Sequence, residues 1–103
     1  MEEIKLIKET ILDVAKEYNV DIDKIILFGS RARGDYREDS DWDILIVTKQ
    51  ALDRKTKFGF WYDIYRKLKF PADIIIVSKD VFERYKSDYG FIYAYALEEG
   101  IVL

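Results

Sequence analysis

The chain has 103 residues, a mass of 12.3 kDa and a formal net charge of −3, with 50% hydrophobic and 36% charged residues. This length predicts one domain over residues 1–103, with a single hydrophobic core and no room for a separate substrate-binding lobe. The sequence contains neither cysteine nor histidine, which excludes disulfides, zinc sites built on thiolate or imidazole, and the Ser-His-Asp and Cys-His catalytic groupings.

The negative charge gives no overall positive field for nucleic acid, so no stable nucleic-acid partner is expected. No apolar stretch approaches the roughly 20 residues that cross a bilayer, and the acidic N-terminal segment lacks the order of a secretory signal. We therefore expect a cytoplasmic protein without a membrane partner. Chemistry is left to carboxylates, lysine, tyrosine and serine, and carboxylate oxygens suit magnesium or manganese.

Apolar residues recur at helical spacing from Glu2 to Tyr18, which predicts an amphipathic helix with a charged outer face. A short apolar run from Lys24 to Phe28 predicts a buried strand that ends at Gly29-Ser30. The polar residues 31–40 are expected to form a loop, which allows one helical turn over 30–33.

A second strand is predicted over Asp41–Thr48 and a third over Asp73–Val77. Between them, Asp53–Lys69 predicts a helix that Pro71 stops, with apolar residues at helical spacing at Phe58, Trp61, Tyr62, Tyr65 and Leu68. A strand, a helix and a strand in this order predict a right-handed crossover within one sheet.

Ser78 is expected to cap a helix over Lys79–Tyr85. A further helix is predicted over Tyr89–Glu98, and Gly100 should end it before a short strand over Ile101–Leu103. The expected fold is therefore an α/β (α+β) domain, in which helices flank a small mixed sheet of at least three strands.

Gly29-Ser30 follows a strand directly and forms a turn that could hold phosphate through backbone amides and the serine hydroxyl. The spacing from Gly29 to Gly34 matches the glycines of a P-loop, but Asp35-Tyr36 stand where that loop needs lysine and then serine or threonine. A P-loop is excluded for that reason. A glycine-serine pair after a strand is usually only a turn, so its meaning depends on the carboxylates that follow.

Asp41 and Asp43 lie on one face of the predicted second strand, and Asp73 begins the third. A calcium-binding EF-hand loop is excluded, because Ile44 and Gln50 stand where it requires glycine and glutamate. Acidic residues at a strand start are often only solvated turn residues. As a pair on one face, however, two carboxylates repel each other, and a bound dication converts this repulsion into ligation.

Three converging carboxylates suit metal-assisted phosphoryl transfer, in which two ions activate the attacking oxygen and neutralise the leaving oxygen. Asp41 and Asp43 would bridge both ions. Asp73 would hold the ion nearer the nucleophile and could accept its proton, since no histidine is available as a base. Ser30 would hold the leaving β- and γ-phosphates.

Gly29-Ser30, the ten residues from Arg31 to Ser40, the Asp41-Trp42-Asp43 segment and the later Asp73 together resemble the DNA polymerase β-type nucleotidyltransferase superfamily. Within it, the segment Gly29–Gly34 and the short chain resemble the minimal nucleotidyltransferase (MNT) domains. These are often the MntA-type antitoxins of HEPN/MNT toxin–antitoxin pairs.

The resemblance implies a polymerase β-like fold, two Mg2+ ions with Mn2+ as an alternative, ATP as donor, and transfer of AMP. In the antitoxin branch it implies transfer to a tyrosine hydroxyl of a cognate HEPN ribonuclease toxin, which silences the toxin. It assigns nucleotide binding to Gly29 and Ser30, with help from Arg31, Arg33 and Ser40, and assigns catalysis and metal binding to Asp41, Asp43 and Asp73.

Two other functions remain open from the sequence. Nucleotidyl transfer to a small molecule such as an aminoglycoside would use the same site, although it usually needs a second domain for the acceptor. A non-catalytic antitoxin would neutralise its partner by covering it, with the nucleotide site idle. A small core cannot bury every C-terminal aromatic residue, so part of this set is expected to form a partner-binding face: Phe82, Tyr85, Tyr89, Phe91, Tyr93 and Tyr95.

Overall fold

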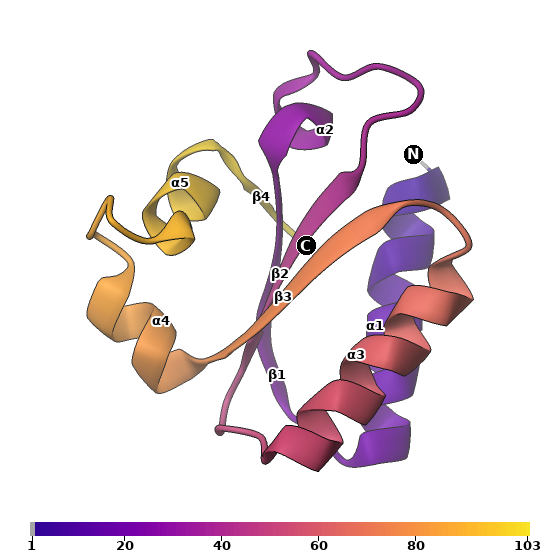
Figure 1. The fold of residues 1–103 in the computed structure, drawn as a ribbon, viewed down its shortest axis with the longest axis vertical. Coiled ribbons are helices and arrows are strands. Elements are labelled where there is room, and N and C mark those ends of the chain that lie inside the picture. The colour runs from indigo at the N-terminus through magenta and orange to yellow at the C-terminus, as the bar shows by residue number, and fades with distance from the viewer. Residues whose placement is uncertain (1) are drawn as a thin grey trace.

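A computed structural model describes residues 2–103 and shows a mixed four-stranded sheet with helices packed on both faces (Figure 1). The strand order in the sheet is β3-β2-β1-β4, so β3 and β4 form its two edges. The elements in chain order are α1 (Glu2–Tyr18), β1 (Ile22–Phe28), α2 (Gly29–Arg33), β2 (Trp42–Thr48), α3 (Arg54–Leu68), β3 (Ala72–Ser78), α4 (Lys79–Tyr85), α5 (Ile92–Glu99) and β4 (Ile101–Val102).

Strand β2 lies between β1 and β3 and pairs differently with each. Its pairing with β1 is antiparallel and sets Phe28 opposite Asp43. Its pairing with β3 is parallel and sets Asp43 opposite Asp73. Helix α3 connects the two parallel strands, which agrees with the strand, helix, strand unit predicted from the sequence. The mixed α/β fold class is therefore confirmed.

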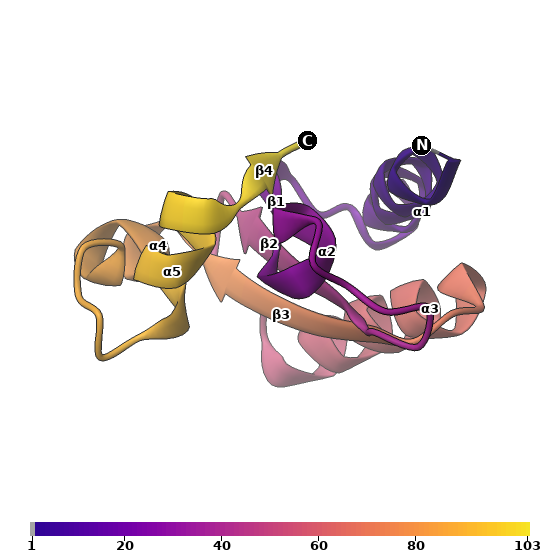
Figure 2. The ribbon, with the colours of Figure 1, turned by 90° about the horizontal axis from the view of Figure 1, so that it is seen from above.

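The sheet buries a core on each face because successive side chains of a strand point to opposite sides. On one face, Ile44 and Ile46 of β2 pack with Phe60 of α3 and with the apolar side of α1. On the other face, Leu45 of β2 packs in a second cluster with Phe82 of α4 and with α5. Figure 2, seen from above, shows α1 and α3 on one side of the sheet and α4 and α5 on the other.

Local capping explains where two of the helices begin. The Asp53 carboxylate accepts a hydrogen bond from the Thr56 amide at 2.7 Å and so caps α3. The Ser78 hydroxyl accepts one from the Val81 amide and caps α4, as the sequence predicts. The predicted bounds of α1 and α4 are confirmed, and the helical turn allowed after β1 is present as α2.

Some expected bounds are wrong. Strand β1 begins at Ile22 rather than at Lys24, and β2 begins at Trp42, so Asp41 precedes the strand. Helix α5 begins at Ile92 rather than at Tyr89. The cause is a turn before it, in which the Asp88 carboxylate accepts a hydrogen bond from the Gly90 amide, and an extended backbone at Phe91. Three further elements differ by one residue at one or both ends: α3, β3 and β4.

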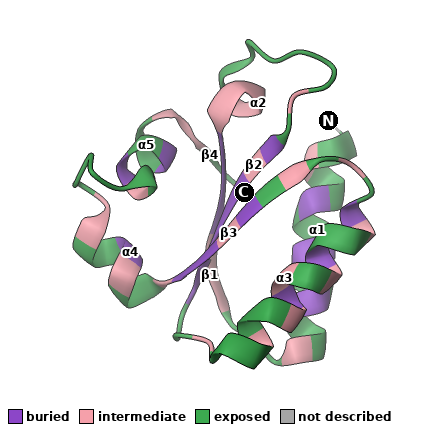
Figure 3. Cartoon of the chain, viewed as in Figure 1, coloured by how far each residue is buried: buried purple, intermediate pink, exposed green. Residues whose placement is uncertain are grey.

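Several aromatic residues are exposed on α3 and near the C-terminus. Figure 3 shows which parts of these segments are buried and which are exposed. Of the aromatic residues near the C-terminus, Phe82 is fully buried, whereas Tyr89 and Tyr95 are 55% and 47% exposed. The buried side of α3 carries Phe60, Ile64 and Leu68. Most of the α3 residues that the sequence predicted at helical spacing are therefore exposed, among them Phe58, Tyr62 and Tyr65. Within residues 2–103, no helix has the length and apolar character that a membrane crossing requires.

Candidate functional site

A cavity of about 570 Å3 lies where β1 ends and where β2 and β3 begin. It is lined by Gly29, Ser30 and Arg33 of α2, by Asp43 of β2, by Asp73 of β3 and by Glu99 of α5, among others. The topology explains this gathering. Strand β1 is antiparallel to β2, and β2 is parallel to β3. The last residues of β1 and the first residues of β2 and β3 therefore lie side by side.

Asp43 and Asp73 are register partners in this cavity, and they point to the face of the sheet that α5 covers. Asp43 is half-buried and Asp73 is exposed. Partial burial raises the pKa of the Asp43 carboxyl above its usual value, and the negative charges of Asp73 and Asp41 raise it further. Two like charges held together in a partly desolvated place are an arrangement that a divalent cation stabilises.

The Gly29 backbone lies directly against the Asp43 carboxylate. Its φ of +74° is in the left-handed region, and a Cβ atom at this position would overlap Asp43 Oδ2. Both facts restrict the position to glycine. The absence of a side chain at Gly29 therefore lets the turn lie against the Asp43 carboxylate. Helix α2 begins at this turn, and Gly34 caps its C-terminal end.

Glu99 lines this cavity, although no sequence motif points to it. Its Oε1 atom accepts a hydrogen bond from the Gly29 amide at 3.2 Å and another from Arg33 Nη1 at 3.0 Å. The bond to Glu99 raises the pKa of the Arg33 guanidinium above its usual value. Glu99 lies 70 residues after Gly29, and the only local signal is its place immediately before Gly100.

Arg31 and Ser40, predicted to assist nucleotide binding, hold the loop that leads into β2. Arg31 donates hydrogen bonds from Nε and Nη2 to the Ser40 carbonyl oxygen, at 3.2 and 3.1 Å. Its guanidinium also lies over two aromatic rings, 4.3 Å from the centroid of Tyr36 and 4.9 Å from that of Trp42. The Ser40 hydroxyl accepts a hydrogen bond from the Arg37 amide at 2.9 Å. Neither residue lines the cavity.

Asp41 is exposed and lies just before β2, outside the cavity lining. Its charge still reaches Asp43, whose pKa it helps to raise. The structure therefore brings together five of the eight predicted site residues, namely Gly29, Ser30, Arg33, Asp43 and Asp73. Asp41 lies beside these residues. Arg31 and Ser40 instead form hydrogen bonds within the loop that precedes β2.

Within the described residues 2–103, no three Asp, Glu, His or Cys side chains gather closely enough to form a ready-made metal centre. The pair Asp43 and Asp73 nevertheless has the donor chemistry that magnesium requires. Magnesium prefers carboxylate oxygens and commonly takes only one or two of them, since water and substrate phosphates fill its remaining positions. The residues present therefore fit a magnesium ion that is completed by a nucleotide.

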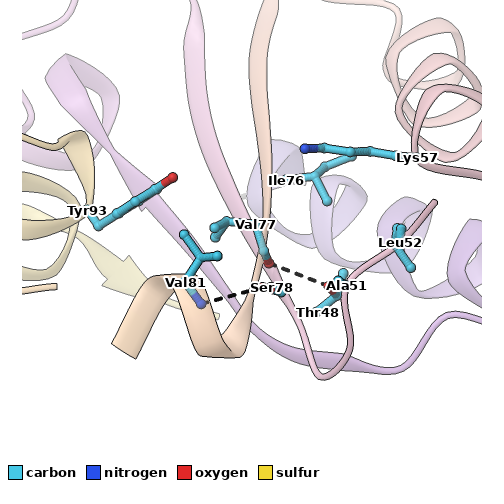
Figure 4. A pocket seen from close by; sticks show the side chains of 9 residues that line it. All are labelled: Thr48, Ala51, Leu52, Lys57, Ile76, Val77, Ser78, Val81 and Tyr93. Atoms are coloured by element: carbon cyan, nitrogen blue, oxygen red, sulfur yellow. Dashed lines mark hydrogen bonds between the residues drawn. The ribbon is translucent and has the colours of Figure 1, made fainter. Parts of the chain in front are cut away.

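A second cavity, of about 280 Å3, lies at the opposite end of the central strands, where β2 and β3 end (Figure 4). Two of its polar side chains serve the fold: Thr48 Oγ1 donates to the Gln50 carbonyl at 2.6 Å, and Ser78 caps α4. No carboxylate stands among its lining residues. It therefore lacks the acidic groups that metal-assisted chemistry needs.

Residues 9–94 match the family model described as "Polymerase beta, Nucleotidyltransferase". The chain is 40% identical over 107 residues to "Putative protein adenylyltransferase MJ0604" of Methanocaldococcus jannaschii, in an alignment that covers 100% of this chain and 99% of the relative.

Two solved structures have a similar fold. A "putative minimal nucleotidyltransferase" aligns with a TM-score of 0.65 at 25% identity, over 99% of this chain and 94% of that one. A chain in the structure of a tri-AMPylated Shewanella oneidensis HEPN toxin in complex with MNT antitoxin aligns with a TM-score of 0.59 at 16% identity, over 95% of this chain and 69% of that one. The second likeness concerns the fold alone.

Proposed function

Because the chain belongs to the polymerase β nucleotidyltransferase family, we propose that it is a metal-dependent protein adenylyltransferase, which moves AMP from ATP to a hydroxyl group of a partner protein. The observation that carries the proposal is the register pairing of Asp43 with Asp73 beside the Gly29-Ser30 turn in one cavity. Nucleotidyl transfer needs carboxylates that bind the metal and a turn that binds the phosphates, and both are present here.

The triphosphate of ATP is bound at the start of α2. Ser30 lines the cavity, and its hydroxyl and adjacent amides would hold the β- and γ-phosphates. The Arg33 guanidinium would neutralise part of their charge. The cavity volume of about 570 Å3 falls within the range of small-molecule sites. The mixture of one cation and several uncharged donors suits a ligand that arrives with its own metal.

Asp43 and Asp73 are the metal-holding residues. Asp41 is a further ligand in this proposal, since it lies just before β2 and its charge reaches Asp43. Bound magnesium would supply positive charge to the phosphate oxygens of the nucleotide. The carboxylates themselves repel each other without a cation, so a loaded site is expected to be more stable than an empty one.

In the transfer step, the acceptor hydroxyl oxygen attacks the α-phosphorus of ATP and forms a new P–O bond. The bond from that phosphorus to the oxygen bridging the β-phosphate breaks, and pyrophosphate leaves. Asp73 accepts the hydroxyl proton, because it is a carboxylate in the cavity that remains accessible to an incoming acceptor. Ser30 and Arg33 stabilise the charge that develops on the departing pyrophosphate.

The proposed acceptor is a tyrosine of a cognate HEPN-type ribonuclease toxin, which makes the chain an antitoxin. Two comparisons support this acceptor: the adenylyltransferase name of the 40% identical relative and the AMPylated toxin in the complex of similar fold. The cavity wall supports it as well, because Ile92 and Tyr95 of α5 line it and are 43% and 47% exposed. An apolar and aromatic wall suits the ring of an incoming tyrosine.

Labelling with α-32P-ATP and Mg2+, in the presence of the protein encoded next to this chain's gene, tests the proposal. Label on a tyrosine of that protein is the expected result, and the Asp41→Asn, Asp43→Asn double variant should lose it. Asp39→Asn is the matched control, since Asp39 is exposed and outside the cavity. Label found only on small acceptors, or inhibition of the partner without label, would overturn the proposal in favour of the other two functions.

A further inference from the structure

Glu99 reaches the phosphate-binding turn because the backbone around it is fixed. Strand β4 pairs antiparallel with β1, with Ile101 opposite Leu27, and the same register extended by two residues sets Glu99 beside Gly29. Gly100 makes this approach possible, because a Cβ there would overlap the Ala96 carbonyl oxygen. The backbone that carries the Glu99 carboxylate is therefore held in place by the pairing of β4 with β1.

One oxygen of Glu99 serves two donors that belong to the turn. Gly29 donates its amide at 3.2 Å and Arg33 donates Nη1 at 3.0 Å to the same Oε1 atom. The Glu99 side chain is only 30% exposed, so these charge-assisted bonds are partly shielded from water. The contact ties the last residue of α5 to both ends of the short helix α2.

The Arg33 guanidinium is held from two sides and keeps part of its donor capacity. Nη1 bonds to Glu99, while Nε lies 3.3 Å from Asp35 Oδ1. Neither contact uses Nη2, which remains available for a phosphate oxygen. Arginine has high rotamer freedom, so a side chain fixed before the nucleotide arrives loses less freedom on binding.

We propose that Glu99 is a positioning residue for nucleotidyl transfer, which holds the Gly29 amide and the Arg33 guanidinium in the geometry that receives the triphosphate. This inference rests on the proposed function, since it assigns Glu99 a role at that same site. Glu99 acts through Gly29 and Arg33 and does not itself touch the nucleotide. The opposite role, a carboxylate that competes with phosphate for the same donors, predicts the reverse sign in the test below.

The test compares Glu99→Gln with the matched control Glu98→Gln, because Glu98 is the preceding residue, is exposed and contacts the Tyr89 hydroxyl instead. ATP binding is measured by calorimetry with Mg2+. We expect the Kd of Glu99→Gln to rise about tenfold, the usual scale for a hydrogen bond to a charged group, and that of Glu98→Gln to stay unchanged. In an Arg33→Ala background the Glu99 substitution should have a clearly smaller effect than in wild type, since only the contact with the Gly29 amide remains.

An equal or tighter affinity of Glu99→Gln would overturn the positioning role while leaving the proposed function intact. Absence of ATP binding to the wild-type chain would overturn the proposed function, and this inference with it. If Glu99→Gln does not fold, Arg33→Gln tests the pair from its other side, because this side chain is 44% exposed and lies outside the core. Unchanged ATP affinity in Arg33→Gln would also reject the proposal.

Discussion

Asp43 and Asp73 lie directly opposite each other on neighbouring parallel strands, one half-buried and the other exposed. Paired strands lie about 4.8 Å apart, so the two carboxyl groups cannot avoid each other's charge. The asymmetry matters, because the half-buried Asp43 has lost water while Asp73 keeps it. The raised pKa of Asp43 follows from this relationship and leads to the first prediction.

Asp43→Asn should make the protein more stable to heat at pH 7. The folded chain holds the Asp43 proton more tightly than the unfolded chain does, because burial and then Asp73 and Asp41 raise its pKa. The stability linked to this group is therefore present below its unfolded pKa of about 3.9 and is lost as the pH rises through the folded pKa. Scanning calorimetry should show a Tm roughly 2 to 5 °C above wild type at pH 7.

The same two proteins should have matching Tm values near pH 3, where wild-type Asp43 is protonated and neutral like asparagine. An increase in Tm that is equally large at both pH values would mean that packing, and not charge, separates the variant from wild type.

Asp43→Asn and Asp73→Asn should each lower the rate of the proposed AMP transfer by at least about a hundredfold, because each removes a proposed metal ligand worth several kcal/mol of charge stabilisation. Initial rates with labelled ATP measure this. Mg2+ with a non-hydrolysable ATP analogue should raise the Tm of wild type and fail to raise that of either variant. An undiminished rate in Asp73→Asn would remove Asp73 from the site, whereas Asp39→Asn should keep both the rate and the thermal shift.

Gly29→Ala and Gly34→Ala form a pair that separates backbone strain from crowding. Both glycines have positive φ angles, +74° and +92°, but only at Gly29 would a new Cβ meet another atom, the Asp43 carboxylate. Gly34→Ala should cost about 1 kcal/mol and retain transfer activity. Gly29→Ala should cost about 3 kcal/mol or more and abolish activity, since Asp43 is displaced as well. Urea unfolding and the labelling assay together decide this, and equal costs would argue against the close approach at Gly29.

Arg31→Lys should loosen the loop over residues 35–41 without removing a charge. The arginine donates to the Glu38 and Ser40 carbonyls and stacks on Tyr36 and Trp42, and lysine cannot reproduce that planar, multiple contact. Limited proteolysis should cut this loop several times faster than in wild type. If cleavage is unchanged and ATP affinity falls instead, Arg31 contacts the nucleotide, as the family resemblance implies.

Much of the fold could be predicted because the signals were local. The helical spacing from Glu2 to Tyr18 and the capping residue Ser78 each produced the expected element at the expected bounds. Bounds were wrong where a side chain competed with the helix for backbone groups, as Asp88 does before α5. The pairing of β1 with β2 was outside the reach of local patterns, since strand order depends on contacts between distant residues.

The candidate site likewise has residues that local sequence patterns predict and residues that only distant contacts bring together. The Gly29-Ser30 turn, Asp43 and Asp73 were predicted to lie together because their spacing is restrictive, and they line one cavity. Glu99 was missed because a single glutamate before a glycine has no spacing to interpret until β4 places it beside β1. Arg31 was assigned to the phosphates by position in a motif, while the structure places its guanidinium on the loop and on Trp42.

The place of β3 at the border of the sheet leaves the reaction centre open along one flank. Asp73 is exposed on that strand, and among residues 2–103 no further strand pairs with its outer side. In the proposed reaction, a side chain on the surface of a partner protein could therefore reach the α-phosphorus without passing through a channel. If the proposed acceptor is a protein, selectivity for it depends on how the two surfaces fit together, and substitutions around this flank are the route to changing the acceptor.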